Sequence, residues 1–232
     1  MYGSRAWEYA LNPEKVLEIQ LQIDPDVIAH VDIPCEIEIL RRLGTNRPTA
    51  ISQTVYNALW IVEKKESGDE RLKNRIVVIG VQGYTKEDYG RCLEQYRNFG
   101  FFDLDPAKYW FAIGSVCMRK PPELYRIVEF VRASIPDEYH VHCYGIANPV
   151  WVLELGRFGV NSVDSATGTY AAGMFRFIDV GGQRKILKLK RKNKYMFAAL
   201  TAFNWMSLEI QIEDGVQVEQ QHLFADCEVC WR

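Results

Sequence analysis

Polar residues that can hold or attack a planar ring follow five short apolar runs in this sequence. The runs at 27–31, 76–81, 109–114, 140–145 and 160–163 have the length and β-branched content of buried strands. At or just after their carboxyl ends stand two carboxylates, an amide, an aromatic ring and small residues: Asp32, Gln82, Gly114, Ser115, Tyr144, Gly145, Asp164 and Ser165. Gathered around one mouth, these groups can grip a polar planar ligand.

A carboxylate at such a mouth also offers covalent chemistry. It can attack an anomeric carbon and form a glycosyl–enzyme intermediate. The alternative for Asp32 and Asp164 is that each only caps the helix that follows its strand. Polar groups after all five runs favour a ligand site over a set of unrelated caps.

Amphipathic segments between the runs supply the framework that would position these residues. Segments 13–23, 49–64, 86–98, 121–133 and 149–158 follow a helical pattern, and three of them begin with proline. Strand and helix alternate with short connections, which predicts a parallel α/β fold, either an open doubly wound sheet or a closed (β/α)8 barrel. In both architectures, reactive groups gather at the carboxyl ends of the strands.

Composition and missing motifs exclude several classes of protein. The chain has 28 Lys and Arg against 30 Asp and Glu, a net charge of −2 and 48% hydrophobic residues, which excludes a disordered tail or a polybasic arm. No G-x-G-x-x-G follows a predicted strand, which disfavours a nucleotide-cradling fold. There is no apolar run of about 18 residues and no apolar leader segment, so we expect a cytoplasmic protein with no membrane partner.

Although the net charge of the chain is −2, a local basic strip at residues 184–194 could contact polyanions. Within 184–194, the residues that can contact nucleic-acid phosphates are Arg184, Lys185, Lys188, Lys190 and Arg191. The same segment alternates Lys with Ile and Leu, so a half-buried strand with a charged, solvated face is the alternative.

The cysteines are of two kinds. Isolated cysteines in apolar or helical stretches are expected to be reduced packing residues: Cys35, Cys92, Cys117 and Cys143. Cys227 and Cys230 instead form a short-spaced C-x-x-C pair.

The motifs, taken in order, resemble those of the tRNA-guanine transglycosylases, the queuine and archaeosine tRNA-ribosyltransferases. The matching segments are L-N-P-E-K at 11–15, D-I-P at 32–34, V-Q-G at 81–83, A-I-G-S at 112–115 and Y-G-I-A-N-P at 144–149. The segment F-G-V-N-S-V-D-S-A at 158–166 is similar to the G-V/A-D-x-F-D-S-A element of the archaeal-type branch. Order and spacing agree from about residue 3 to residue 173.

The resemblance implies a (β/α)8 TIM-type barrel with a zinc-binding insertion. Residues 1–173 would form a partial transglycosylase barrel, and residues 174–232 a C-terminal basic and β-rich segment. The family's Asp-Ser-Gly-Gly-Phe-Gln segment, which carries an additional catalytic aspartate, does not occur in the sequence. We therefore expect this chain to lack the first barrel strands, as a fragment of a longer protein or as a divergent copy.

The implied reaction exchanges a guanine in nucleic acid for a 7-deazaguanine. Asp164 falls on the family's nucleophile, which attacks the ribose C1′, expels the base and leaves a covalent aspartyl–ribose intermediate. The target nucleotide must leave its stack to be reached. Both tRNA and DNA stay open as substrates: tRNA enzymes are the bulk of the family, but the D-I-P and D-S-A elements also suit its DNA-modifying relatives.

The implied base pocket consists of the other strand-end residues. Asp32 falls on the carboxylate that accepts the N1–H and exocyclic amine of the base, and Gln82 on an amide that reads the base. The Gly114-Ser115 loop falls on the backbone that faces the carbonyl and 7-substituent, and Tyr144-Gly145 on the position of a large side chain against the ring.

The family's zinc element is C-x-C-x-x-C followed by a downstream His. Cys227 and Cys230 keep two of its three cysteines, and His222 is close in sequence. Two thiolates and one imidazole fall short of the four ligands of a structural zinc, so we expect a zinc site that is incomplete in this chain.

Two other functions stay open. A non-catalytic homologue would serve as a subunit of a homo- or hetero-oligomer or as a nucleic-acid-binding partner, since eukaryotic queuine enzymes pair a catalytic chain with a non-catalytic one. The missing aspartate segment favours this function, whereas the presence of both Asp164 and Asp32 favours the enzyme. An unrelated barrel hydrolase is the third; no lysine follows a predicted strand as a Schiff-base candidate, which disfavours an aldolase.

Overall fold

The computed structural model describes residues 12–146, 148–173, 176–178, 184–186, 201–202 and 204–206. The chain divides into two compact units. The first unit comprises residues 1–144 and 159–161, and the second comprises residues 145–158 and 162–232. Each unit is described by itself below. The domain boundary expected after residue 173 stays a prediction.

A parallel sheet forms the centre of the first unit. Its strands are β1 (Val27–Ala29), β2 (Ile76–Val81), β3 (Tyr109–Ile113) and β4 (Val141–Cys143), and each pairs in parallel with the next along the chain. In a doubly wound sheet the strand order reverses at a switch point, whereas in a barrel the strands follow one another in chain order. The order β1-β2-β3-β4 is therefore that of a barrel segment, which decides between the two predicted architectures.

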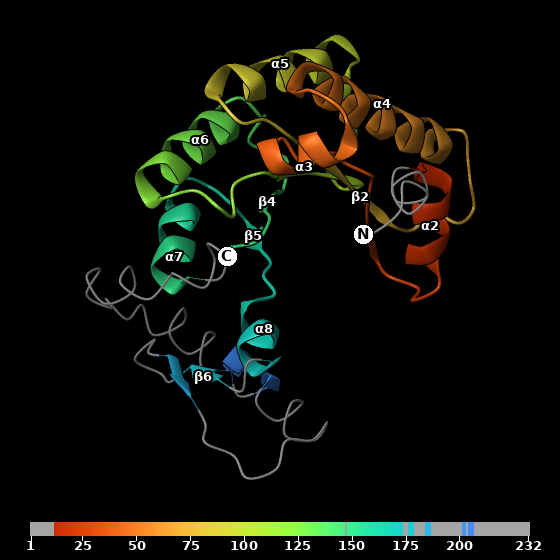
Figure 1. Ribbon diagram of the computed structural model, residues 1–232. Coiled ribbons are helices and arrows are strands. Elements are labelled where there is room, and N and C mark those ends of the chain that lie inside the picture. The colour runs from red at the N-terminus through yellow and green to blue at the C-terminus, as the bar shows by residue number, and fades with distance from the viewer. Residues whose placement is uncertain are drawn as a thin grey trace. The chain divides into compact units, whose positions relative to one another are not determined.

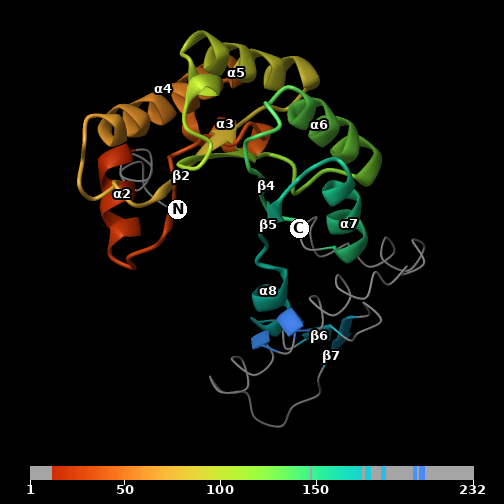
Figure 2. The ribbon, with the colours of Figure 1, turned by 180° about the vertical axis from the view of Figure 1, so that it is seen from behind.

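Helices join these strands and cover one face of the sheet. Helix α4 (Arg47–Glu66) precedes β2, α5 (Lys86–Asn98) precedes β3, and α6 (Pro121–Ala133) precedes β4. Figure 1 and the reverse view in Figure 2 show the three helices side by side along the same side of the sheet. The remaining helical elements of this unit are α2 (Pro13–Leu21), α3 (Ile37–Leu43) and a short 3-10 helix, η1 (Phe101–Asp103).

Side-chain caps fix where these helices begin. Asn12 Oδ1 accepts from the backbone N–H of Lys15 at 3.1 Å, and Asn46 Oδ1 accepts from that of Thr49 at 3.0 Å. At the start of α5, Thr85 and Asp88 form a reciprocal capping box, in which each side chain accepts from the other's backbone N–H. Proline occupies the first turn of α2, α4 and α6, where its missing N–H costs nothing.

The two faces of the sheet differ in burial. The face toward the helices is fully buried: Val77, Ile79, Val81, Tyr109, Phe111, Ile113, Val141 and Cys143. Helix α5 contacts this face through Tyr96, whose ring lies 6.2 Å from that of Phe111. On the opposite face, Trp110 and His140 are half-buried and stack on each other with ring centroids 3.7 Å apart.

Two tyrosine hydroxyls attach α5 to the sheet. The Tyr96 hydroxyl donates to Gly80 O at 2.7 Å, and the Tyr89 hydroxyl donates to Gly114 O at 2.6 Å. Both side chains are fully buried, and burial raises the pKa of each phenol, so both stay protonated donors. The helix thus contacts backbone carbonyls beside two of the predicted site positions.

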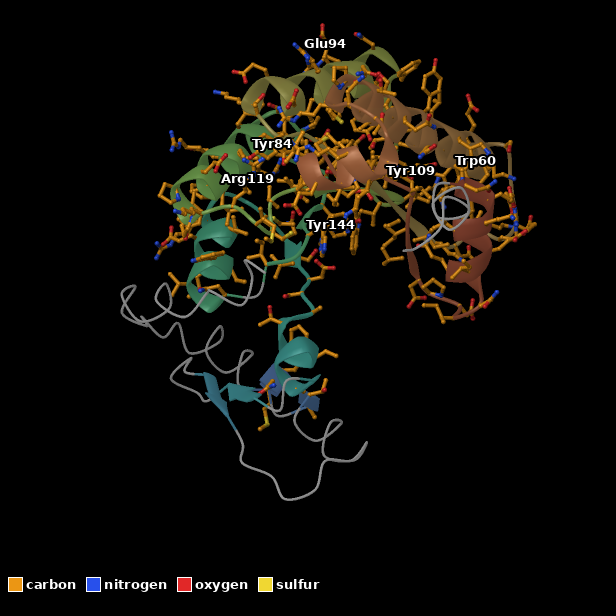
Figure 3. All side chains as sticks on the ribbon, in the orientation of Figure 1. Trp60, Tyr84, Glu94, Tyr109, Arg119 and Tyr144 are labelled. Atoms are coloured by element: carbon orange, nitrogen blue, oxygen red, sulfur yellow. The ribbon has the colours of Figure 1, made fainter. Side chains whose placement is uncertain are left out.

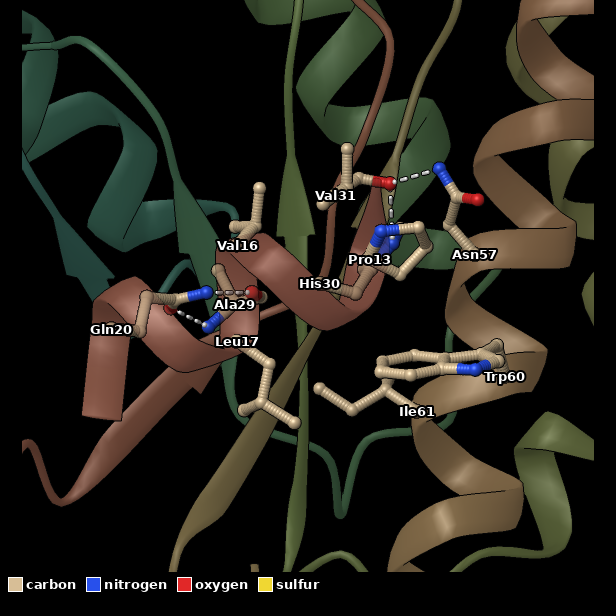
Figure 4. Close-up of a pocket in the computed structure, with 10 residues that line it drawn as sticks. All are labelled: Pro13, Val16, Leu17, Gln20, Ala29, His30, Val31, Asn57, Trp60 and Ile61. Carbon is tan, nitrogen blue, oxygen red and sulfur yellow. Dashed lines mark hydrogen bonds between the residues drawn. The ribbon is translucent and has the colours of Figure 1, made fainter. Parts of the chain in front are cut away.

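The outer edge of β1 is closed by side-chain amides (Figure 4). Gln20 of α2 donates through Nε2 to Ala29 O at 2.8 Å, and its Oε1 accepts from Ala29 N at 3.0 Å. Asn57 of α4 donates to Val31 O at 2.9 Å. These amides satisfy backbone groups that an unpaired strand edge would otherwise present.

The second unit contains α7 (Pro149–Arg157), β5 (Ser162–Val163), α8 (Thr167–Gly173) and an antiparallel pair, β6 (Arg176–Ile178) with β7 (Arg184–Ile186). Asn148 caps α7, since its Oδ1 accepts from Val150 N at 3.1 Å. Asn204 is buried and donates through Nδ2 to Gly168 O at 3.0 Å.

The predicted strands and helices are confirmed in kind, with ends that differ by a few residues. Within the described ranges, no helix has the length and apolar character needed to cross a membrane. Helix α3 and helix α8 were not predicted. For 184–186 the strand is confirmed, because these residues form β7, whereas the predicted half-burial of one face stays a prediction. Their side chains lie outside the description, so the phosphate contacts of Arg184 and Lys185 stay a prediction.

Replacing Tyr96 by phenylalanine tests whether its hydroxyl holds α5 to the sheet. Loss of the buried hydrogen bond to Gly80 should lower the free energy of unfolding by about 1 kcal/mol, measured by urea denaturation. Tyr56→Phe is the matched control, because Tyr56 is 63% exposed on α4, and it should change the value by less than about 0.5 kcal/mol. Equal effects of the two substitutions would contradict this role.

Candidate functional site

The predicted residues Asp32 and Gln82 are in direct contact at the carboxyl ends of β1 and β2. Gln82 is 1% exposed and donates through Nε2 to Asp32 Oδ2. An ionised carboxylate only accepts hydrogen bonds, so the amide nitrogen, not the amide oxygen, must face Asp32. This contact fixes one end of the Gln82 amide.

Ser115 follows β3 and contacts the other end of the same amide. Its Oγ lies 2.6 Å from Gln82 Oε1 and 3.1 Å from Glu36 Oε2, and it accepts from the backbone N–H of Cys35 at 2.8 Å. Ser115 has φ 56°, in the left-handed region that non-glycine residues seldom adopt. The structure thus brings together Asp32, Gln82 and Ser115, three of the predicted pocket residues.

Two glycines make room for this cluster. A Cβ on Gly114 would overlap the Gln82 amide, and a Cβ on Gly80 would lie 3.1 Å from Asp32 Oδ2. Gly114 was predicted as a site residue for its backbone. Its close packing against Gln82 is a second reason why only glycine fits at this position.

A buried histidine lies beside Asp32. His30 Nε2 accepts from Gly80 N at 2.7 Å, and Nδ1 lies 3.0 Å from Val31 O. Because Nε2 accepts, the proton of the neutral ring is on Nδ1, where it can be donated to Val31 O. Burial lowers the pKa of His30, and the Asp32 carboxylate opposes that shift only in part.

Tyr84, in the loop after β2, lies beside Arg119 (Figure 3), and a second arginine, Arg47, also contacts its ring. The guanidinium of Arg119 lies 3.9 Å from the centre of the Tyr84 ring, and that of Arg47 lies 4.1 Å from it. Arg119 also donates to Tyr84 O at 2.7 Å and to Ser115 O at 3.4 Å, and it pairs with Glu123. The loops after β2 and β3 are thereby tied to each other.

Tyr144 follows β4 and is half-buried (Figure 3). Its backbone N–H donates to Ile113 O at 3.1 Å, and its ring contacts that of His142 edge-on with centroids 4.9 Å apart. The predicted stacking of this ring on a base stays a prediction.

In the second unit, Asp164 and Gly145 are in contact. The exposed carboxylate of Asp164 accepts through Oδ1 from Gly145 N at 2.7 Å. At the start of α8, Ser165 Oγ accepts from Thr167 N at 3.1 Å, so a residue other than Asp164 provides this turn with an acceptor. That Asp164 shares a mouth with Asp32 stays a prediction.

The remaining predicted residues lie outside the description or differ from expectation. Lys188, Lys190, Arg191, Cys227 and Cys230 are outside the described residues. Among the residues that are described, no group of three or more His, Cys, Asp or Glu could hold a metal ion. Cys35, Cys92 and Cys143 are buried thiols as predicted, whereas Cys117 is exposed. The packing role predicted for Cys117 is wrong, because it lies in the turn beyond the end of β3.

Two neighbours of the cluster were not identified from the sequence, His30 and Glu36. His30 stands two residues before Asp32, and Glu36 four residues after it. The only available signal was this proximity to a strand-end carboxylate. Proximity does not reveal that Glu36 would reach the hydroxyl of Ser115.

The fold and the site define a parallel α/β protein of barrel type with an amide and a carboxylate in contact at its strand ends. The family model described as queuine tRNA-ribosyltransferase matches residues 4–201, and the chain belongs to that family. It is 25% identical over 187 residues to the queuine tRNA-ribosyltransferase of Psychromonas ingrahamii, covering 80% of this chain and 46% of that protein. It is also 25% identical over 189 residues to the enzyme of the same name from Haemophilus ducreyi, covering 79% of this chain and 45% of that protein. The chain thus spans about half the length of these curated relatives.

The buried His30 and the half-buried His140 predict that acid weakens the fold. Burial lowers the folded-state pKa of His30 and of His140 below the ordinary 6.5, and neighbouring His142 lowers that of His140 further. Below pH 6.5 the unfolded chain binds protons that the folded chain does not, so stability falls as the pH falls through this range. Urea denaturation between pH 5 and pH 8 should show the decrease.

The variant His30→Gln keeps an oxygen that can accept from Gly80 N but removes the titrating ring. It should show a shallower decrease in unfolding free energy below pH 6.5 than the natural chain. An identical pH dependence in the two proteins would assign the acid effect to other groups.

Proposed function

We propose that this chain acts in a base-exchange pentosyltransferase that replaces a guanine in tRNA by a 7-deazaguanine. The observation that carries the proposal is the contact between Asp32 and Gln82 at neighbouring strand ends, in a chain that matches the family over residues 4–201. The two relatives reported above are named queuine tRNA-ribosyltransferases, which favours tRNA over DNA as the substrate.

Asp164 is proposed as the nucleophile. Its carboxylate oxygen bonds to the ribose C1′ while the bond from C1′ to the guanine breaks, and the departing base takes up a proton. The incoming 7-deazaguanine then bonds to C1′ through N9, loses the proton of that nitrogen, which balances the one taken up by the departing guanine, and releases the carboxylate. Asp164 is exposed, and its Oδ1 accepts from Gly145 N, which holds the carboxylate in one orientation.

Asp32 and Gln82 are proposed to recognise the base before exchange. The carboxylate of Asp32 accepts from the ring N1–H and the exocyclic amine, a pairing that a guanine or 7-deazaguanine offers along one edge. Once the base occupies Asp32, the Gln82 amide exchanges its carboxylate contact for one with the base. Ser115 and Gly114 contribute backbone groups, and Tyr144 stacks on the ring.

The nucleic acid is proposed to be held by the basic strip. The target nucleotide is unstacked to expose C1′, and the lost stacking is offset by contacts elsewhere on the substrate. Arg184, Lys185, Lys188, Lys190 and Arg191 supply cations for the phosphates, so binding should weaken with salt. Zinc is proposed as a structural ion that takes Cys227 and Cys230 as two of its ligands.

One observation favours the second candidate, a non-catalytic homologue that serves as a subunit or nucleic-acid-binding partner. Asp32 and Gln82 satisfy each other, and Gln82 is almost inaccessible. A base must break this contact to be read. A subunit that binds no base would retain it.

The substitution Asp164→Asn in the full-length protein separates the two candidates. An amide is a poor nucleophile, so the variant should form no covalent adduct with a guanine-containing tRNA hairpin on a denaturing gel, and labelled-guanine exchange should fall by about 10⁴-fold or more. Asp26→Asn is the matched control, because Asp26 is exposed just before β1, at the opposite end from Asp32. An adduct of unchanged yield in Asp164→Asn would refute the assigned nucleophile. No exchange by the natural protein, with or without a partner chain, would favour the subunit.

A further inference from the structure

A directional chain of hydrogen bonds connects Cys35, Ser115, Gln82 and Asp32. The Cys35 N–H donates to Ser115 Oγ at 2.8 Å, so the hydroxyl proton is left to donate onward. Two acceptors are within reach of that proton, Gln82 Oε1 at 2.6 Å and Glu36 Oε2 at 3.1 Å. The shorter contact goes to Gln82.

The direction of the chain is dictated by chemistry at both ends. Asp32 accepts only, so the Gln82 NH2 group faces it, and Oε1 must face Ser115. Gln82 is 1% exposed, so an Oε1 without a donor would be a buried, unsatisfied acceptor. The Ser115 hydroxyl therefore sets which end of the amide points away from β3.

The backbone of Ser115 supports this function for its hydroxyl. Its φ of 56° is one that glycine adopts without strain, yet a serine stands here. Strained residues persist where the surrounding structure over-determines them, and such residues cluster at functional sites. Around Ser115 this support comes from Cys35 N and from Arg119, which donates to Ser115 O.

We propose that the Ser115 hydroxyl is a positioning group that determines which base the site accepts. This inference rests on the proposed function. When the ring N1–H and the exocyclic amine occupy Asp32, the next group along that edge of the ring, the carbonyl at position 6, meets Gln82. With Oε1 held by Ser115, the amide can present only its NH2 group.

The orientation of the Gln82 amide thus determines which group at position 6 of the base is bound best. A carbonyl at position 6 accepts from the NH2 group, whereas a weaker acceptor leaves that donor poorly paired in a buried place. Without the hydroxyl, the amide can turn over and present its oxygen instead. Ser115 would then act through Gln82 without touching the base with its side chain.

Guanine and 6-thioguanine test the proposal, because they share the N1–H and the 2-amino group and differ only in the acceptor at position 6. Affinities are measured by calorimetric titration of the full-length protein and of two variants, Ser115→Gly and Ser115→Ala. Loss of one oriented hydrogen bond should lower the preference for guanine over 6-thioguanine by about tenfold in both variants. The preference for guanine over hypoxanthine, which reports the 2-amino contact with Asp32, should stay the same.

Ser115→Gly also separates positioning from a purely structural role. Both variants lose the hydroxyl and its hydrogen bonds, but only glycine adopts this φ without strain, so Ser115→Gly should unfold at a higher temperature than Ser115→Ala while base discrimination falls equally in both. Ser67→Ala is the control, because Ser67 is an exposed serine at the end of α4. Unchanged discrimination by both Ser115 variants would overturn this inference alone. Failure of the natural protein to bind guanine would overturn the proposed function and this inference with it.

Discussion

Parallel pairing of β1, β2, β3 and β4 in chain order is the constraint on which the first unit depends. It brings the carboxyl ends of successive strands to one edge, so residues 50 positions apart in sequence, Asp32 and Gln82, share a hydrogen bond. The same pairing places one face of the whole sheet against the helices. Polar chemistry can therefore gather at the strand ends while the apolar surface is buried elsewhere.

Helix α5 helps to hold the backbone of the site in place. Its two buried tyrosines reach past the strand side chains to the carbonyls of Gly80 and Gly114, the two glycines against which Asp32 and Gln82 pack. A shift of α5 would move both glycines. A helix, and not only a loop, therefore holds the two glycines that pack against Asp32 and Gln82. Such support suits a site that must distinguish similar ligands.

Much of this frame could be predicted from the sequence, because proline, cap residues and apolar periodicity mark its helices. The observed bounds of α5 and α6 are those predicted from such signals. Helix α3 gave no comparable signal, since it has seven residues and only Leu40 is buried. The cluster of Asp32 and Gln82 followed from their strand-end positions. The bridge through Ser115 did not, because a left-handed serine and its reach to Glu36 depend on tertiary contacts.

The side-chain amides of Gln20 and Asn57 that cover the edge of β1 affect how another strand could pair with this edge. Such a strand must displace the Gln20 side chain, which already exchanges two hydrogen bonds with Ala29. Backbone groups of the new strand would replace the Gln20 amide, so Ala29 would keep the same number of hydrogen bonds. The driving force for this pairing would then have to come from covering apolar side chains such as Val27, which is 37% exposed. Lengthening of the sheet at this edge would therefore be governed by shape and hydrophobicity, with hydrogen bonding almost neutral.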